Sequence, residues 1–381
     1  MDFELSEEQL MLQSSLRDFV DQEIVQHAST WEEQESFPWD AWRKLTDLGL
    51  CSLTLPSEYS AGVSGSKMLF ALAVEEIARG SAGLATSYLV SSGIAMENIV
   101  KYGSESQKRD YLTRCARGQL AFFALTEPLG GSDLRSMQTR YSRQSNHFVV
   151  DGTKTFITNG EEADFGLVYA RDRNTSGSKG ISCFVVQKDS PGFSVGRKER
   201  KTGQHCSSTT ELTFNGCHLP LDSLVGHEGQ GLRMALEAID ASRVSIGAQA
   251  LGIARAAYEA ALDYATERKA FGKSIGQFQA IQWMLADMAT DIEAASLLVY
   301  KAAWLIDNGR PFAKRAAMAK LYSTEACRRI CHNAVQIFGG YGYTKDCPVE
   351  RYARDHRVTE IYEGTSEMQR WAIARETTGL K

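Results

Sequence analysis

The chain has 381 residues, of which 43% are hydrophobic and 23% are charged, and its formal net charge is −5. This composition supports a large buried core and argues against an intrinsically disordered chain. Because the sequence has no basic block, nucleic acid and anionic membrane surfaces are not expected as partners. No apolar run approaches the roughly 18 residues that a membrane-spanning helix requires.

The first ten residues, MDFELSEEQL, are acidic and lack both the apolar stretch of a secretory signal and the Arg-rich character of a transit peptide. We therefore expect a cytoplasmic bacterial protein, or the mature form of a mitochondrial matrix protein without its transit peptide. The eight cysteines are scattered and form no CxxC pair. This spacing predicts reduced thiols rather than a disulfide framework.

Helical patterns occupy the first part of the chain. Ser6 and Gln9 have the spacing of a capping box, in which each side chain bonds the other residue's backbone N–H at a helix start. Leu12 and Leu16 then recur on one helical face. We predict an N-terminal helical domain over residues 1–118.

Short runs rich in β-branched and aromatic residues follow, which predicts a middle β-domain over residues 119–228. Within it, residues 148–150 and 153–158 flank Asp151-Gly152. This dipeptide is typical of two-residue turns, so we expect a β-hairpin with its turn at Asp151-Gly152.

Longer helical patterns return in residues 229–381. Apolar residues between 281 and 306 recur at alternating steps of four and three, which is typical of packed, nearly parallel helices. Asn308-Gly309 is a stop signal for that helix, and Gly339-Gly340 is one for the next. This part is predicted to be a C-terminal helical bundle.

Five short segments carry residues suited to catalysis or cofactor binding: 123–133 (FALTEPLGGSD), 156–160 (FITNG), 268–272 (RKAFG), 336–340 (QIFGG) and 361–366 (IYEGTS). Taken alone, each also has an ordinary structural explanation, such as a capped loop, a surface Arg beside a buried aromatic residue, or a helix end. No Gly-x-Gly-x-x-Gly follows a predicted strand, so a Rossmann nucleotide fold is not expected.

Together, the five segments closely resemble the acyl-CoA dehydrogenase family, in its order and spacing and over essentially the whole chain. The short-chain, butyryl-type members look nearest. The resemblance implies an α+β fold that is mainly helical, with an N-terminal helical domain, a barrel-like middle β-domain and a C-terminal four-helix bundle. It also implies FAD as the cofactor, an acyl-CoA substrate and electron-transferring flavoprotein as the electron acceptor. The implied assembly is a homotetramer, a dimer of dimers in which a neighbouring chain completes each flavin site.

Glu363 decides the reaction that the resemblance implies. Its carboxylate would remove the α-proton of the thioester while hydride passes from Cβ to flavin N5, giving trans-2-enoyl-CoA. Because such an α-proton is weakly acidic, the base needs a desolvated setting that raises its pKa. Some branches of the family carry the base near position 242, but this chain has Ser242 there, so Glu363 has no rival.

The resemblance assigns further residues to the site. The expected FAD-binding residues are Phe123, Leu125, Thr126, Ser132, Phe156, Thr158, Arg268, Phe271, Gln279, Gln336, Gly340, Thr365 and Glu367. The expected substrate-binding residues are Ser132, Asp240, Arg243, Tyr362 and Gly364. Asp240 and Arg243 are three residues apart, which also fits a surface ion pair. The family usually has Trp at position 156, near its docking surface for the electron acceptor, so Phe156 bears on the identity of that acceptor.

The acyl group is the main open question. Residues 93–100 are expected to line the pocket for the acyl tail, with Glu97 facing either solvent or the pocket, and we expect a short or medium acyl chain. Two alternatives remain: a dehydrogenase of a carrier-protein-bound acyl group in biosynthesis, and an inactive flavin-binding structural or regulatory relative. Cys327, Cys331 and His332 share a predicted helix, but no fourth ligand is evident, so no metal is expected.

Overall fold

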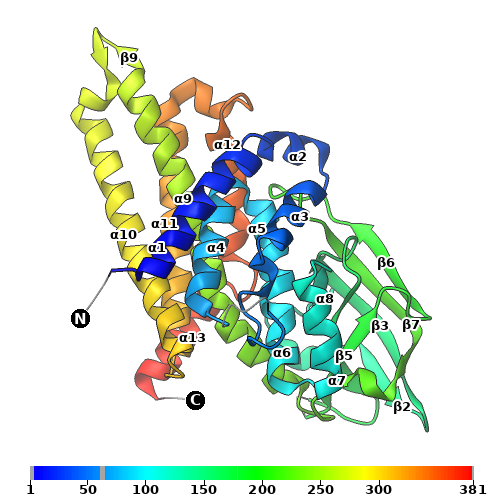
Figure 1. Ribbon diagram of the computed structural model, residues 1–381. Helices are drawn as coiled ribbons and strands as arrows, with labels where there is room; N and C mark the ends of the chain where they lie inside the picture. The colour runs from blue at the N-terminus through cyan, green and yellow to red at the C-terminus, as the bar shows by residue number, and fades with distance from the viewer. Residues whose placement is uncertain (1–3, 61–64, 178, 380–381) are drawn as a thin grey trace.

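The structure, a computed structural model, describes residues 4–60, 65–177 and 179–379. Its first part is helical, as predicted (Figure 1). The helices are α1 (Glu7–Val20), α2 (Ala28–Gln34), α3 (Trp39–Asp47), α4 (Lys67–Gly80), α5 (Ala82–Leu89), α6 (Ala95–Tyr102), α7 (Glu105–Gln107) and α8 (Thr113–Ala116). The predicted capping box at the start of α1 is confirmed: the Gln9 N–H donates to Ser6 Oγ over 3.3 Å, and the Ser6 N–H donates to Gln9 Oε1 over 3.0 Å.

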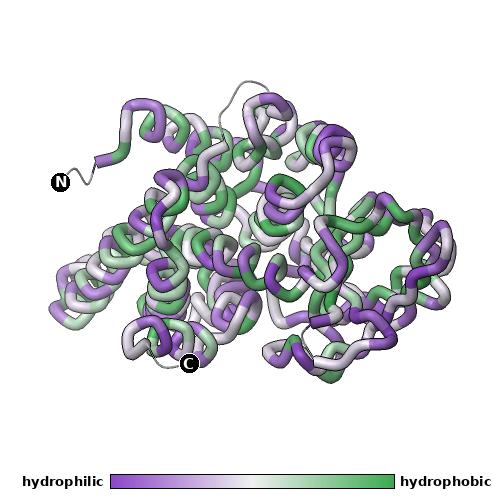
Figure 2. The backbone as a smooth tube through the Cα atoms, turned by 90° about the horizontal axis from the view of Figure 1, so that it is seen from below, coloured by the Kyte–Doolittle hydropathy of each residue, from purple (hydrophilic) through white to green (hydrophobic). Residues whose placement is uncertain are grey.

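A twisted sheet occupies the middle of the chain, on the right of Figure 1. Its strands are β1 (Ala121–Ala124), β2 (Arg140–Arg143), β3 (His147–Thr158), β4 (Phe165–Asp172), β5 (Ile181–Gln187), β6 (Phe193–Lys198), β7 (Thr209–Pro220) and β8 (Leu224–Val225). They are arranged in the order β6-β7-β3-β2-β4-β5-β8, and β1 pairs with β4 in parallel. Figure 2 shows the strands curving into a ring-like outline beside the helices.

The hairpin predicted at Asp151-Gly152 is wrong, because β3 runs through this dipeptide from His147 to Thr158. The pairing of β3 with β7 shifts register between Val150 and Gly152, so the dipeptide forms a bulge. An Asp-Gly sequence suits a bulge as well as a turn, since both need a flexible residue. Glycine is required here, because a Cβ on Gly152 would lie 2.6 Å from the Cα of Thr139 on the neighbouring segment.

The last part of the chain is helical again. Its elements are α9 (Gly231–Glu267), a hairpin of β9 (Lys269–Ala270) and β10 (Lys273–Ser274), α10 (Gln279–Asp307), α11 (Ala313–Phe338), α12 (Pro348–Asp355) and α13 (Ser366–Thr378). The three long helices α9, α10 and α11 pack together, α13 packs on α11, and α4 packs on α9 (Figure 1). Both stop signals are confirmed, since α10 ends at Asp307 and α11 ends before Gly339, which has a φ of +61°.

The fold class is therefore as predicted: helical, then a sheet, then helical. The domain limits at residues 118 and 228 stay a prediction. All residues of α4 and α5 are buried, which places these two helices at the centre of the molecule. In the part of the chain that the structure describes, no helix is long and apolar enough to cross a membrane. All eight cysteines are free thiols, seven of them buried.

Candidate active site

Glu363 lies in the loop between the turn His356–Glu360 and α13. It has a φ of +51°, and the following Gly364 has a φ of +94°. A left-handed backbone is unfavourable for a residue with a Cβ, and such strain gathers at functional sites. Six non-glycine residues of the described chain have a positive φ, and three of them are predicted site residues: Phe156, Phe271 and Glu363.

Side chains from two helices hold this loop. The Ser242 hydroxyl of α9 donates to the Glu363 carboxylate, and the Tyr362 phenol donates to Gln249 Oε1, also on α9. Gln249 Nε2 in turn donates to Thr86 Oγ1 of α5 over 2.6 Å. The loop is thus tied through α9 to the buried centre of the molecule. This arrangement gives the Glu363 carboxylate a fixed position.

The electrostatic setting of Glu363 suits a base. Burial raises the pKa of its carboxyl group, while the Ser242 hydrogen bond and the positive charges of Lys320, Lys67 and Arg243 oppose that rise. The net effect is a raised pKa, so the carboxylate binds a proton more readily than a solvated Glu does. General bases with a pKa nearer to the operating pH transfer protons more effectively.

Lys320 of α11 contacts the same loop. Its Nζ donates to the carbonyl oxygens of Tyr362, over 2.7 Å, and of Gly364. Sequence reasoning missed this residue. The available signal was a lone charged residue among the small apolar residues of the α11 sequence AAMAKL, on the face that packs into the bundle.

Asp240 and Arg243 form an ion pair of 2.6 Å on α9, but not a surface pair, because the Arg243 side chain is only 11% exposed. Burial lowers the pKa of Arg243 and raises that of Asp240. Arg243 Nε is buried and has no hydrogen-bond partner among the described residues. An unpartnered guanidinium N–H within electrostatic reach of Glu363 is suited to an incoming polar ligand.

The first group of predicted flavin residues lies in β1 and directly after it. Phe123 is half-buried and packs against Tyr169, with ring centroids 5.1 Å apart, while Leu125 is buried and Thr126 is half-buried. A buried ion pair fixes this segment: Lys154 Nζ lies 2.8 Å from Glu127 Oε1 and donates to the Leu125 carbonyl over 3.1 Å. Sequence reasoning missed this pair, although Lys154 occupies a buried position of β3.

The end of β3 presents an aromatic surface. Phe156 has a φ of +57° and is 62% exposed, while the adjacent Thr158 pairs with Thr209 of β7. Asn159 anchors the strand end, because its Nδ2 donates to the carbonyls of Ser87 and Ala121, each over 3.1 Å. An exposed aromatic ring on a rigid strand suits stacking against a flat heterocycle. Of the other predicted residues, Ser132 is exposed in the loop after Glu127.

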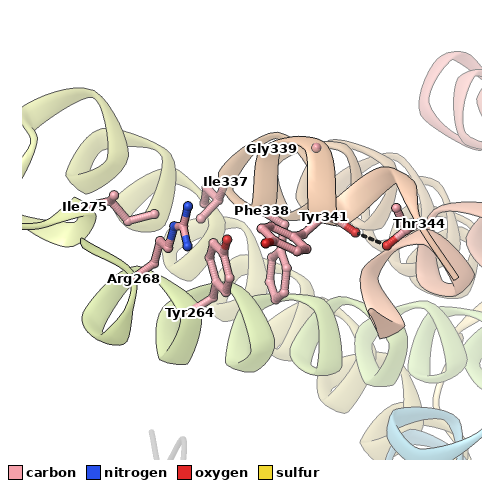
Figure 3. A pocket seen from close by; sticks show the side chains of 9 residues that line it. Tyr264, Arg268, Ile275, Ile337, Phe338, Gly339, Tyr341 and Thr344 are labelled. Atoms are coloured by element: carbon pink, nitrogen blue, oxygen red, sulfur yellow. Dashed lines mark hydrogen bonds between the residues drawn. The ribbon is translucent and has the colours of Figure 1, made fainter. Parts of the chain in front are cut away.

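The second group of predicted flavin residues lies at the opposite end of the molecule, near β9 at the top of Figure 1. Arg268 and Gly340 line a pocket of about 520 Å³ there, together with Tyr264, Phe338 and Tyr341 (Figure 3). The remaining residues of this group, Phe271, Gln279 and Gln336, are exposed and do not line the pocket. Two more predicted residues belong to α13: Thr365 caps its start, accepting from the Met368 N–H, and Glu367 is exposed in its first turn.

Glu97 of α6 forms an ion pair. It pairs with Lys67 at the start of α4, with 2.6 Å between Lys67 Nζ and Glu97 Oε1. The Lys67 side chain is buried, and its charge acts on Glu363. The segment expected to line the acyl pocket therefore carries the carboxylate of an ion pair whose lysine is within electrostatic reach of the candidate base.

Comparison with known proteins places this geometry in a family. Family models described as the N-terminal, middle and C-terminal domains of acyl-CoA dehydrogenase match residues 6–119, 122–217 and 229–378. A short-chain specific acyl-CoA dehydrogenase of Clostridium acetobutylicum is 42% identical over 377 residues, covering 98% of this chain and 99% of the relative. The mitochondrial short-chain enzyme of Rattus norvegicus is 42% identical over 372 residues, covering 97% of this chain and 90% of the relative.

A solved structure gives the same result. The butyryl-CoA dehydrogenase of Megasphaera elsdenii superposes with a TM-score of 0.97 at 36% identity, covering 99% of this chain and 100% of the other. The match extends over the loop of Glu363, the sheet and the helical bundle alike. This chain therefore belongs to the acyl-CoA dehydrogenase family and is an oxidoreductase that dehydrogenates acyl-CoA.

Proposed function

We propose that the protein catalyses FAD-dependent α,β-dehydrogenation of an acyl-CoA thioester to trans-2-enoyl-CoA, with Glu363 as the base that removes the α-proton. The observation that carries this proposal is the Glu363 carboxyl group itself. It is held by Ser242, its pKa is raised by burial, and its backbone is kept in a left-handed conformation. Glu363 is half-buried, and a fixed, partly desolvated carboxylate is what abstraction of a weakly acidic α-proton requires.

The residues present fit FAD. The exposed ring of Phe156 offers a stacking face to an isoalloxazine ring, and the Thr158 hydroxyl, two residues along β3, offers a hydrogen bond. The segment from Phe123 to Thr126 lies alongside, because the Thr155 N–H donates to the Thr126 carbonyl over 3.0 Å. Arg268, in the pocket of Figure 3, offers a guanidinium to a pyrophosphate. When bound, FAD supplies the acceptor for the hydride that leaves the substrate Cβ.

The assembly follows from where these residues lie. Within one chain, β3, which carries Phe156, belongs to the sheet on the right of Figure 1, whereas Arg268 directly precedes β9 at the top, so we propose that one FAD does not reach both. We propose that a neighbouring copy supplies Arg268, Phe271, Gln279, Gln336 and Gly340 to each flavin, in a homotetramer built as a dimer of dimers. The exposure of Phe271, which is 95%, supports this arrangement, since a bare aromatic tip is unfavourable in water.

The proposed substrate is a short or medium acyl-CoA. The relatives named as short-chain and butyryl-CoA enzymes support this range. Ser132, Asp240, Arg243, Tyr362 and Gly364 are the proposed substrate contacts. The unpartnered Nε of Arg243 supports its part in this set.

The proposed electron acceptor is electron-transferring flavoprotein, and the protein is proposed to act in the bacterial cytoplasm or the mitochondrial matrix. A carrier-protein thioester as substrate remains the alternative within the enzyme class. The CoA esters named for the relatives favour CoA.

The Glu363→Gln variant tests the proposed reaction. It should keep FAD and bind butyryl-CoA, yet lose turnover by about three orders of magnitude or more, because positioning survives and only the base is removed. Glu8→Gln, which changes an exposed glutamate of α1, is the matched control and should turn over normally.

The readout is an anaerobic visible spectrum before and after butyryl-CoA and then octanoyl-CoA. The wild-type flavin band should bleach with at least one of them. Bleaching of Glu363→Gln at the wild-type rate would mean that the base lies elsewhere, and a protein that cannot be loaded with FAD would refute the cofactor.

A further inference from the structure

A buried lysine is hydrogen-bonded to the backbone on both sides of the candidate base. Lys320 of α11 is 0% exposed, and its Nζ donates to the carbonyl oxygens of the two residues on either side of Glu363, which are Tyr362, over 2.7 Å, and Gly364. A single ammonium group therefore holds the backbone before and after the residue that carries the carboxylate.

Packing alone does not account for Lys320. Its neighbours one turn away on the buried face of α11 are small and uncharged: Ala316, Ala317, Ser323 and Thr324. Burying an ammonium group is unfavourable unless it is paired, and an apolar side chain of similar length would fill the same volume without that penalty. Lys320 is therefore kept for the hydrogen bonds and charge that it brings to the loop.

The loop needs such an anchor. Glu363 and Gly364 both have left-handed backbones, with φ of +51° and +94°, and this conformation persists in a non-glycine residue only where the surroundings enforce it. Ser242 fixes the carboxylate, but it does not touch the backbone. Lys320 fixes the two flanking carbonyls, and Gln369 Nε2 adds a second bond to the Gly364 carbonyl over 2.8 Å.

Resting on the assignment of Glu363 as the base in the proposed function, we propose that Lys320 is a positioning residue for the reaction. It clamps the backbone on both sides of Glu363, and so holds the carboxylate toward the α-carbon of the substrate. Among the described residues, the Lys320 ammonium donates hydrogen bonds to the loop carbonyls of Tyr362 and Gly364, so it acts through Glu363.

The charge of Lys320 acts as well. The charged groups around Lys320 and Glu363 come from four other elements: Lys67 on α4, Arg243 on α9, Glu360 on the preceding turn and Glu367 on α13. Burial lowers the pKa of Lys320 to about 7, and Glu363 is the strongest opposing influence. The ammonium in turn lowers the pKa of Glu363. A neutral amine keeps two N–H donors, so above pH 7 the clamp persists while the charge effect fades.

The first test compares Lys320→Met with Lys314→Met, which removes a half-exposed lysine from the same helix. The Met variant at 320 should keep its FAD and its KM for butyryl-CoA within about twofold, while kcat falls by roughly a hundredfold, the scale expected for a misplacement of about 1 Å. The exchange of butyryl-CoA α-protons into D2O, measured under anaerobic conditions by mass spectrometry, should fall in parallel. Lys314→Met should resemble the wild type in each measurement.

The second test is the pH profile of kcat. Loss of the ammonium raises the pKa of Glu363, so the acid limb of Lys320→Met should move to higher pH. Lys320→Arg keeps the charge, and its acid limb should stay at the wild-type position with part of the rate restored. A Met variant that fails to fold leaves the Arg variant and Lys320→Gln, which lacks the charge, to make the same comparison.

Glu363→Gln, measured in parallel, separates the two proposals. An inactive Glu363→Gln, together with wild-type rates, exchange and pH profile in Lys320→Met, would overturn the role of Lys320 alone. An active Glu363→Gln would overturn the proposed base whatever Lys320 does. Loss of FAD and thermal stability with no change of the acid limb in any variant would show a merely structural lysine.

Discussion

Replacing Lys154 by Met should destabilise the sheet part of the protein measurably. Lys154 is 0% exposed, and it pairs with Glu127 across 2.8 Å inside the protein. Removing one partner of a buried pair typically costs about 3–5 kcal/mol, because the other charge stays buried without its counter-ion. Since the entropy of unfolding is about 2.1 cal/mol/K per residue, a loss of about 4 kcal/mol lowers the melting temperature of a 381-residue cooperative unit by about 5 °C.

The sign of the pH dependence gives this prediction a second check. Burial alone would raise the pKa of Glu127, but Lys154 and the backbone N–H groups of Gln138 and Thr139 outweigh it and lower the pKa. In the wild type, Glu127 therefore stabilises the fold above its unfolded pKa, and that stability is lost as the pH falls through its folded pKa. Without Lys154, burial dominates, and protonation relieves the penalty. The difference in melting temperature should shrink between pH 7 and pH 5.

Circular dichroism of the FAD-loaded protein measures these melting temperatures. The double variant Lys154→Met/Glu127→Gln should recover part of the loss, because it no longer buries an unpaired charge. Lys188→Met, an exposed lysine after β5, is the control and should shift the melting temperature by less than about 1 °C. A Lys154→Met variant that melts with this control, or one whose deficit is the same at both pH values, would refute the argument.

Two further predictions concern the cofactor and the acyl pocket. Arg268→Ala should weaken FAD retention by about tenfold or more, as expected for loss of a charge-assisted hydrogen bond. The ratio of flavin to protein absorbance after gel filtration measures retention, and Lys273→Ala is the control. Equal retention in both variants would exclude Arg268 from the FAD site. The double variant Lys67→Met/Glu97→Leu removes the ion pair near the Glu363 loop. It should raise kcat/KM for hexanoyl-CoA relative to butyryl-CoA several-fold, because apolar tails then no longer desolvate a charged pair. An unchanged ratio from a CoA-ester panel would place the pair outside the pocket.

Local signals predicted the helices well and the sheet less well. The capping box at Ser6 and the stop after Asp307 depend on residues within a few positions of each other, so the sequence contains the whole interaction. The outcome at Asp151-Gly152 depends instead on β7, more than 60 residues away, where the Gly216 N–H donates to Asp151 Oδ1 over 2.6 Å. Turns and bulges both favour this dipeptide, and the pairing with the partner strand decides which of the two forms.

The site shows the same division between local and distant information. Glu363 could be singled out from the sequence because its immediate neighbours carry the resemblance. The structure adds that the backbone after Glu363 is left-handed, a conformation that favours glycine at position 364. Lys320 and Lys154 could not be singled out in this way, because nothing local marks a buried lysine whose partners are a carbonyl 42 residues away and a carboxylate 27 residues away. Both lysines hydrogen-bond to the segments that carry the predicted site residues. The motifs therefore predicted the residues expected to contact the ligands, but not the residues that hold those segments in place. Both lysines are buried charged residues whose hydrogen bonds end on backbone carbonyls of a motif, and this feature identifies such supporting residues in the folded chain.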